Sequence, residues 1–523
     1  MNKNILQYKN IYFCKNLVDI IINVNLIAYF GLEASHFIDI SKYFLSACQH
    51  NNFNIVKFLI ENYKFDINYK DKFGNNCLFY ASCSNDVNTI KYLMSNYKFD
   101  INMKNYFKQN CLMFACSYID DIPFLSSLDE SITQNYRNIY DKNSEYKNYP
   151  NNFCIIKYLI EECKVDINHK DIMLNNCLMY ACCHNPNIDV IKYLIEKCKI
   201  DKNDKNNQGD NCLSLACFNN QNINIIKYLI EKHKMKLNLK NNDGDNCLLL
   251  ACNNNQNIDI IKYLIKDCKM NINFKNHNNE NCLLVACNNN QNIDIIRYLI
   301  EELKMDKNSK NNNNDTCLLL ACYYNPNIDI MEYLIQDCKL DINFRNNNND
   351  SCLTLASFQN SNIEIVKCLI EKYEMDIYSE NDNGDNCLSI FLGNDTNISI
   401  IKYLMDINRE NYNNENCLLL AFANNPNINT IKYLIEECKM DTNVEDNNGN
   451  NCLQLACINN LHITIIKYLI ENRRMDANRR NNHGNNCLSL ACTYNPNINL
   501  IKYLIEECKM DINLKDNYDN NCL

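Results

Sequence analysis

Cysteine is the residue type whose number and spacing in this chain could do chemistry. The 523 residues include 33 cysteines, enough for a disulfide framework or several zinc sites. Thirteen stand in a repeated Cys-Leu pair, and recurring partners such as Cys212 and Cys217 lie five residues apart, whereas zinc knuckles use a two-residue gap. Their recurrence at fixed places favours buried structural thiols in a reducing compartment.

Other residues that could support catalysis are scattered. The eight histidines do not pair at metal-ligand spacing. No glycine loop for phosphate is present, because Gly393 is the one glycine inside a helical unit. We therefore expect no catalytic residues, no cofactor and no metal.

Charge and hydropathy argue against two classes of partner, nucleic acids and membranes. The 52 Lys and Arg against 62 Asp and Glu give a net charge of −10 and a pI of about 5.4, whereas nucleic-acid modules usually carry a basic face. The most apolar stretch, residues 17–30, is interrupted by Asp19, Asn23 and Asn25, so it does not fit a spanning helix. We expect no nucleic acid, no membrane and an intracellular chain.

The elements that position the cysteines recur every 35 residues, from Cys177 to Cys387 and again from Cys417 to Cys522. In one unit Asn211 can cap a first helix, and Ile223, Ile226 and Ile230 place an apolar stripe on a second. Such a stripe is too wide for one helix pair to cover, so each unit must pack against its neighbours. The pattern predicts an all-α repeat solenoid of stacked helix-turn-helix units joined by β-hairpin-type loops.

A turn residue stands three positions before many of the repeated cysteines. Because Gly and Asn enter positive φ most easily, a tight turn is expected there. These positions are Gly74, Gly209, Gly244, Gly384, Gly449 and Gly484, and Asn279, Asn314, Asn349 and Asn414.

These residues resemble the ankyrin repeat. The stretch 209–216, Gly-Asp-Asn-Cys-Leu-Ser-Leu-Ala, is similar to the family's Gly-x-Thr-Pro-Leu-His-x-Ala, and Ile226-Lys227-Tyr228-Leu229-Ile230 to its second helix. The resemblance covers roughly residues 45–523. Cys replaces the family's Pro, and one residue is added between the helices and another after the second helix, where Cys268-Lys269-Met270 replaces Gly-Ala. We expect the fold to survive with slightly longer turns.

Four departures from the repeat set the predicted domain boundaries. Residues 1–44 are expected to be a degenerate N-terminal cap or a small docking segment, followed by about thirteen units over 45–523. An insertion at 117–152 is interpreted as either a functional loop or a linker. A shortened unit at 387–416 is expected to lack about one turn of its second helix, and a partial unit occupies 515–523.

The resemblance implies that partners meet the loop tips and the exposed end of each first helix. Large aromatic side chains there are typical anchors, so Tyr323, Tyr324 and Phe358 form the preferred patch. The alternative is that they pack against neighbouring units. The matching positions are Phe218, Asn253, Asn288, Tyr323, Tyr324, Phe358, Ile458, Thr493 and Tyr494.

Three functions remain open from the sequence. The first is a non-enzymatic, monomeric scaffold that binds another protein. The second is an adaptor that delivers a captured protein to machinery such as a ubiquitin ligase through residues 1–44 or the insertion. The third is a structural spacer or drifting copy of an expanded family, which the surface Asn runs at 253–256 and 288–291 would suit. Asn-rich arrays of this kind resemble those of giant amoeba viruses and amoebae, which implies the cytoplasm of an amoebal cell.

Overall fold

The computed structural model describes residues 40–49, 53–63, 66–84, 87–117, 152–359, 362–393, 398–407, 418–419, 421–422, 427–459 and 462–520. Most of the predicted N-terminal segment, the insertion, Asn414 and the last three residues lie outside these ranges. The chain divides into two compact units, Met1–Val285 and Ala286–Leu523. The boundary falls inside one helix, α15 (Cys282–Asn289).

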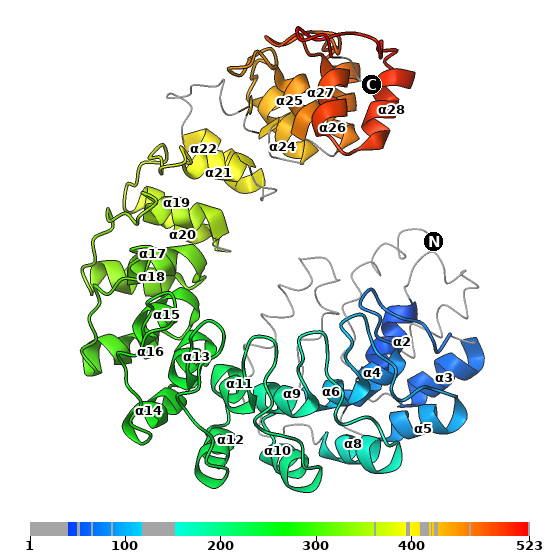
Figure 1. Cartoon of the computed structure of the whole chain (residues 1–523), viewed down its shortest axis with the longest axis vertical. Coiled ribbons are helices and arrows are strands. Elements are labelled where there is room, and N and C mark those ends of the chain that lie inside the picture. The colour runs from blue at the N-terminus through cyan, green and yellow to red at the C-terminus, as the bar shows by residue number, and fades with distance from the viewer. Residues whose placement is uncertain are drawn as a thin grey trace, which may run out of the picture. The chain divides into compact units, whose positions relative to one another are not determined.

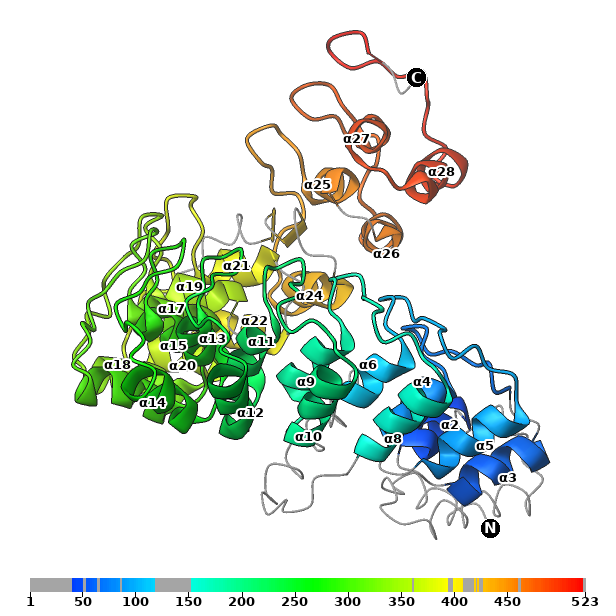
Figure 2. The same ribbon diagram turned by 60° about the horizontal axis from the view of Figure 1, so that its bottom comes forward.

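In the first unit, first helices of successive repeats lie side by side in one row and second helices in another (Figure 1, Figure 2). The unit opens with α2 (Ile40–Gln49) and α3 (Phe53–Tyr63). Its later first helices are α4 (Cys77–Ser82), α6 (Cys111–Cys116), α9 (Cys177–His184), α11 (Cys212–Asn219) and α13 (Cys247–Asn254). Its later second helices are α5 (Asn88–Asn96), α8 with η4 (Phe153–Lys157, Tyr158–Glu162), α10 with η5 (Ile188–Lys192, Tyr193–Lys197), α12 with η6 (Ile223–Lys227, Tyr228–Lys232) and α14 (Ile258–Lys266).

The second unit repeats this arrangement. Its described first helices are α17 (Cys317–Tyr324), α19 (Cys352–Gln359), α21 (Cys387–Gly393), α25 (Cys452–Asn459) and α27 (Cys487–Tyr494). Its second helices are α16 with η7 (Ile293–Arg297, Tyr298–Glu302), α18 (Ile328–Gln336), α20 (Ile363–Glu371), α22 (Ile398–Ile407), α24 with η8 (Ile428–Lys432, Tyr433–Glu437), α26 with η9 (Ile463–Lys467, Tyr468–Asn472) and α28 (Ile498–Glu506). The predicted all-α repeat solenoid is confirmed.

The described first helices from α4 to α27 begin after a capping side chain, as the sequence predicts. Asn211 accepts hydrogen bonds from the backbone N–H groups of Leu213 and Ser214 at 3.0 Å. Thr316 caps α17 and Ser351 caps α19 in the same way. Because first-turn amides have no partner within the helix, this cap fixes where each first helix starts.

The residue that this repeat adds after the second helix, relative to the ankyrin repeat, is accommodated in a wider last turn of that helix. The Cys198 N–H donates to the carbonyl of Tyr193 five residues earlier, at 3.0 Å, so the last turn is wider than an α-helical one. Lys199 then takes a left-handed conformation with φ of 59°. The expected longer turn is therefore a widened helix end closed by a left-handed lysine.

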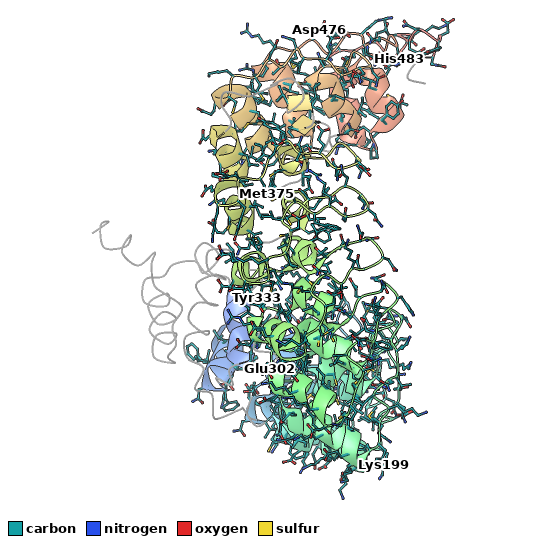
Figure 3. All side chains as sticks on the ribbon, turned by 90° about the vertical axis from the view of Figure 1, so that its left-hand side faces the viewer. Lys199, Glu302, Tyr333, Met375, Asp476 and His483 are labelled. Atoms are coloured by element: carbon teal, nitrogen blue, oxygen red, sulfur yellow. The ribbon has the colours of Figure 1, made fainter. Side chains whose placement is uncertain are left out.

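The loops between repeats turn where the sequence places Gly or Asn. Gly209 has φ of 81° and Asn279 of 65°. Successive loops also bond to one another, since the Asn517 N–H donates to the carbonyl of His483 at 3.0 Å. His483 marks a loop tip that projects beyond the helices in Figure 3. Within the described residues the only strand-like pairs are the isolated bridges Lys310–Thr316 and Glu445–Asn451, so these hairpin-type loops form no sheet.

Two expectations about local structure are wrong. The run at 253–256 is not all surface, because Asn255 is fully buried. Its amide donates to the carbonyls of Cys217 and Asn220 in the preceding repeat, both at 3.0 Å. In the shortened unit, α22 (Ile398–Ile407) is as long as the other second helices, so the missing residues do not come from that helix. The end of that unit lies outside the described residues.

Candidate functional site

Most cysteines of the described residues are buried in the packing between helices. All 30 cysteines among the described residues are free thiols. A hydrogen bond with Cys247 of the next repeat, together with burial, raises the pKa of the Cys217 thiol well above its usual value. Because the thiolate is the nucleophile and metal ligand, such thiols are unreactive. Within the described residues, no group of three or more His, Cys, Asp or Glu could hold a metal ion.

A groove of about 250 Å³ lies in the second unit, between first helices α17 and α19 and the loops beside them. Two leucines and two aromatic residues of the two helices line it, together with Asn and Asp residues of the loops before α17, α19 and α21. The lining residues are Asn313, Asp315, Leu320, Tyr323, Asn346, Asn348, Asp350, Leu355, Phe358, Asn381 and Asn383.

Two members of the predicted aromatic patch, Tyr323 and Phe358, line this groove, and both are half-buried. Tyr324 does not line it. Its ring packs against Tyr323 with 4.0 Å between centroids, and 43% of the residue is exposed. Burial, the contact with Tyr324 and the nearby carboxylates of Asp350 and Asp315 raise the pKa of Tyr323 to about 12. Tyr323 is therefore neutral at physiological pH, and it lines the groove as an uncharged aromatic residue.

The other predicted contact residues do not join this groove. Phe218 and Asn253 belong to the first unit and are half-buried. In the second unit, Asn288 and Ile458 are half-buried, and the two positions at the end of α27 are exposed, with Tyr494 63% exposed. The Thr493 hydroxyl donates back to the Ser489 carbonyl at 2.8 Å.

The carboxylates of the groove were missed by reasoning from the sequence. Asp315 and Asp350 stand two positions before Cys317 and Cys352, in loops for which the sequence predicted only a turn. Both residues are mostly buried, 8% and 5% exposed, and both line the groove. Acidic residues two positions before the repeated Cys, as in Asp315, Asp350 and Asp385, would have signalled them.

Comparison with known proteins fits this architecture. A family model described as ankyrin repeats (3 copies) matches residues 44–136, 147–243, 219–311, 248–346, 283–381, 353–446 and 418–516. The chain belongs to the ankyrin-repeat family. Ankyrin repeats are generally protein–protein interaction modules, and the family is typically non-enzymatic.

Individual relatives add little to this assignment. Among curated proteins, none matches this ankyrin chain in sequence. One solved structure that resembles it is a predatory endopeptidase from Bdellovibrio bacteriovorus in complex with an immunity protein. The match has 23% identity and a TM-score of 0.28, and it covers 37% of this chain and 92% of the other. No described helix of the ankyrin array is long and apolar enough to cross a membrane.

Proposed function

We propose that this ankyrin array is a non-enzymatic scaffold that captures another protein, and that the groove between α17 and α19 is its main contact site. The observation that carries the proposal is that two aromatic residues line this groove. Tyr323 and Phe358 offer large, half-buried rings on adjacent repeats, and such side chains dominate binding energy when a partner covers them.

The loops support this role because they hold the groove wall rigid. The Asn347 N–H donates to the carbonyl of Asn313, and the Asp382 N–H to that of Asn348, both at 3.0 Å. These bonds fix three successive loops along one side of the groove. A preorganised wall loses little conformational entropy when a partner binds, which suits capture of an extended segment.

A random library of displayed seven-residue peptides tests the proposal on the full chain. Peptides are selected on the wild type and then tested on a Tyr323→Ala/Phe358→Ala double variant. The matched control is Phe218→Ala, which removes a half-buried ring from the corresponding position of α11 in the first unit. We expect a class of peptides that loses at least about tenfold in affinity on the double variant and binds the control normally.

Circular dichroism and thermal unfolding of the three proteins show whether the repeats remain folded. If every selected peptide binds the folded double variant as tightly as the wild type, the groove is not the contact site. A chain from which no peptide is selected also contradicts the proposal.

A further inference from the structure

We infer that the groove between α17 and α19 takes the cationic side chain of a partner, a lysine or an arginine carried on an extended segment. This inference rests on the proposed function and adds the chemistry of the group that is recognised. It is carried by the loop carboxylates of Asp315 and Asp350, and by the Asn that some other repeats, such as those of Asn75 and Asn175, have in their place.

The groove holds negative charge without a compensating cation. Asp315 and Asp350 line it, and its lining includes no Lys or Arg. Among the ion pairs of the described residues, none involves either carboxylate. Their hydrogen-bond partners are neutral amides. Asn346 Nδ2 donates to both carboxylates, 2.8 Å from Asp315 Oδ1 and 3.2 Å from Asp350 Oδ2.

One shared amide nitrogen therefore holds two like charges close together in a partly desolvated hollow. Such charges interact more strongly there than in bulk water. A cation in the groove would be attracted by both carboxylates, and its carbon chain or planar head would pack against Tyr323 and Phe358. The aromatic and acidic residues of the lining thus fit the two parts of a long basic side chain.

The fold does not require a carboxylate at this position. In the loop before α17, the backbone N–H of Asp315 donates to Asn311 Oδ1 at 2.8 Å, and Asn311 Nδ2 donates back to Asp315 Oδ2 at 3.0 Å. The loop before α4 has the two residue types exchanged. There Asn75 N–H donates to Asp71 Oδ1 at 2.8 Å and Asn75 Nδ2 to Asp71 Oδ2 at 3.0 Å.

The bond to the following repeat is also the same in both arrangements. Asn346 donates to Asp315 Oδ1 at 2.8 Å, and Asn105 donates to Asn75 Oδ1 at 2.9 Å. The loops that contain Asn175 and Asn450 also follow the exchanged pattern. Either order of Asp and Asn therefore forms the same loop hydrogen bonds, and the loop carries one negative charge in both cases. What differs is whether the carboxylate stands two positions before the Cys, the place from which Asp315 and Asp350 reach the groove.

This exchange provides a test that changes the groove charge while preserving the hydrogen bonds. The double variant Asn311→Asp/Asp315→Asn moves one carboxylate by four residues, off the groove lining, at constant net charge. Asp315→Asn removes the same charge, and the chain already has a loop with Asn at both places, Asn481 and Asn485. The matched control is Asp245→Asn, at the corresponding position of the first unit.

The probes are peptides from the seven-residue library that bind wild type and fail on Tyr323→Ala/Phe358→Ala. We expect these groove-dependent peptides to share a Lys or Arg whose replacement by Gln weakens binding about tenfold or more. Asn311→Asp/Asp315→Asn and Asp315→Asn should each weaken the same peptides to a similar extent, and Asp245→Asn should not. Binding should also weaken from 50 to 500 mM salt.

Two results would overturn the inference in distinguishable ways. Groove-dependent peptides that need no basic residue, or that bind the folded exchange variant at full strength, would leave the groove as a contact site and remove its preference for cations. If no peptide depends on Tyr323 and Phe358, the proposed function fails and the inference fails with it.

Discussion

Replacement of Lys269 by glycine is expected to stabilise the repeat that α14 closes. Lys269 follows this helix with φ of 57°, in the left-handed region. Its neighbours fix that conformation, since the Cys268 N–H donates to Tyr263 C=O at 3.0 Å and the Met270 N–H to Leu264 C=O at 3.1 Å. The Lys269 side chain is exposed, so its removal opens no cavity.

The magnitude follows from two opposing effects. A Cβ in the left-handed region costs about 1–2 kcal/mol, and glycine removes that cost. Glycine also gives the unfolded chain more freedom, which offsets about 0.5–1 kcal/mol. A net gain of about 0.5–1 kcal/mol is expected, and a stretch of the array that opens by local unfolding should then exchange its amides about two- to fivefold more slowly.

Hydrogen exchange measured by mass spectrometry on the full chain is the suitable assay, because long repeat arrays do not unfold in one step. Lys266→Gly is the matched control, since Lys266 is also exposed but ends α14 in ordinary helical conformation. It should destabilise by up to about 1 kcal/mol. Equal or faster exchange of α13 and α14 in Lys269→Gly would refute the reasoning about the left-handed lysines.

Three further predictions concern buried groups of the first unit. Asn255→Ala should lower the local stability measured by hydrogen exchange by about 2–3 kcal/mol, because two buried carbonyls lose their donor. The control Asn254→Ala loses one part-buried side-chain hydrogen bond and should lower it by less than about 1 kcal/mol. Burial, with the nearby carboxylates of Asp245 and Asp243, raises the pKa of Asp210 to about 6 from 3.8. The folded chain therefore binds this proton more tightly, so the penalty of ionisation is absent below pH 3.8 and complete above pH 6. Asp210→Asn should therefore raise the local stability of α11 and its loop, measured by hydrogen exchange, by about 1–2 kcal/mol at pH 7.5. It should leave that stability unchanged at pH 3.8, and equal gains at both pH values would contradict this. In a brief iodoacetamide pulse followed by peptide mapping, exposed Cys154 should be modified while Cys217 and Cys247 stay unmodified, and their rapid labelling in the native chain would contradict their structural role.

The sequence was sufficient for the helices because their signals are local and repeated. A capping Asn, Thr or Ser before a Cys-Leu pair and a broad Ile stripe specify most helix pairs, and the repetition of this pattern along the chain reinforces the interpretation. Positive φ at Gly209 and Asn279 follows from residue type in the same way. Leu174, with φ of 62°, takes the same left-handed conformation although leucine disfavours it. The packing of the repeats on either side outweighs the conformational preference of this one residue.

What could not be predicted depends on contacts between repeats. Asn255 looks like one of several surface asparagines until the preceding repeat is placed against it and its amide is seen to join two carbonyls. The groove likewise forms between α17 and α19, which belong to two repeats, so the sequence of a single repeat does not reveal it. Tyr323 and Phe358 were predicted as anchors from their type. The recurring acidic position would have pointed to Asp315 and Asp350, but that these two residues line one groove follows only from the stacking of the loops.

Hydrogen exchange of the full chain with and without a selected groove-dependent peptide is the most direct test of the central claim that this ankyrin array binds a partner in its second unit. The account predicts added protection in the loops before α17, α19 and α21 and at the ends of α17 and α19, with α11 and its loop unchanged. Protection confined to other repeats, with residues 313–323 and 346–358 unaffected, would contradict it.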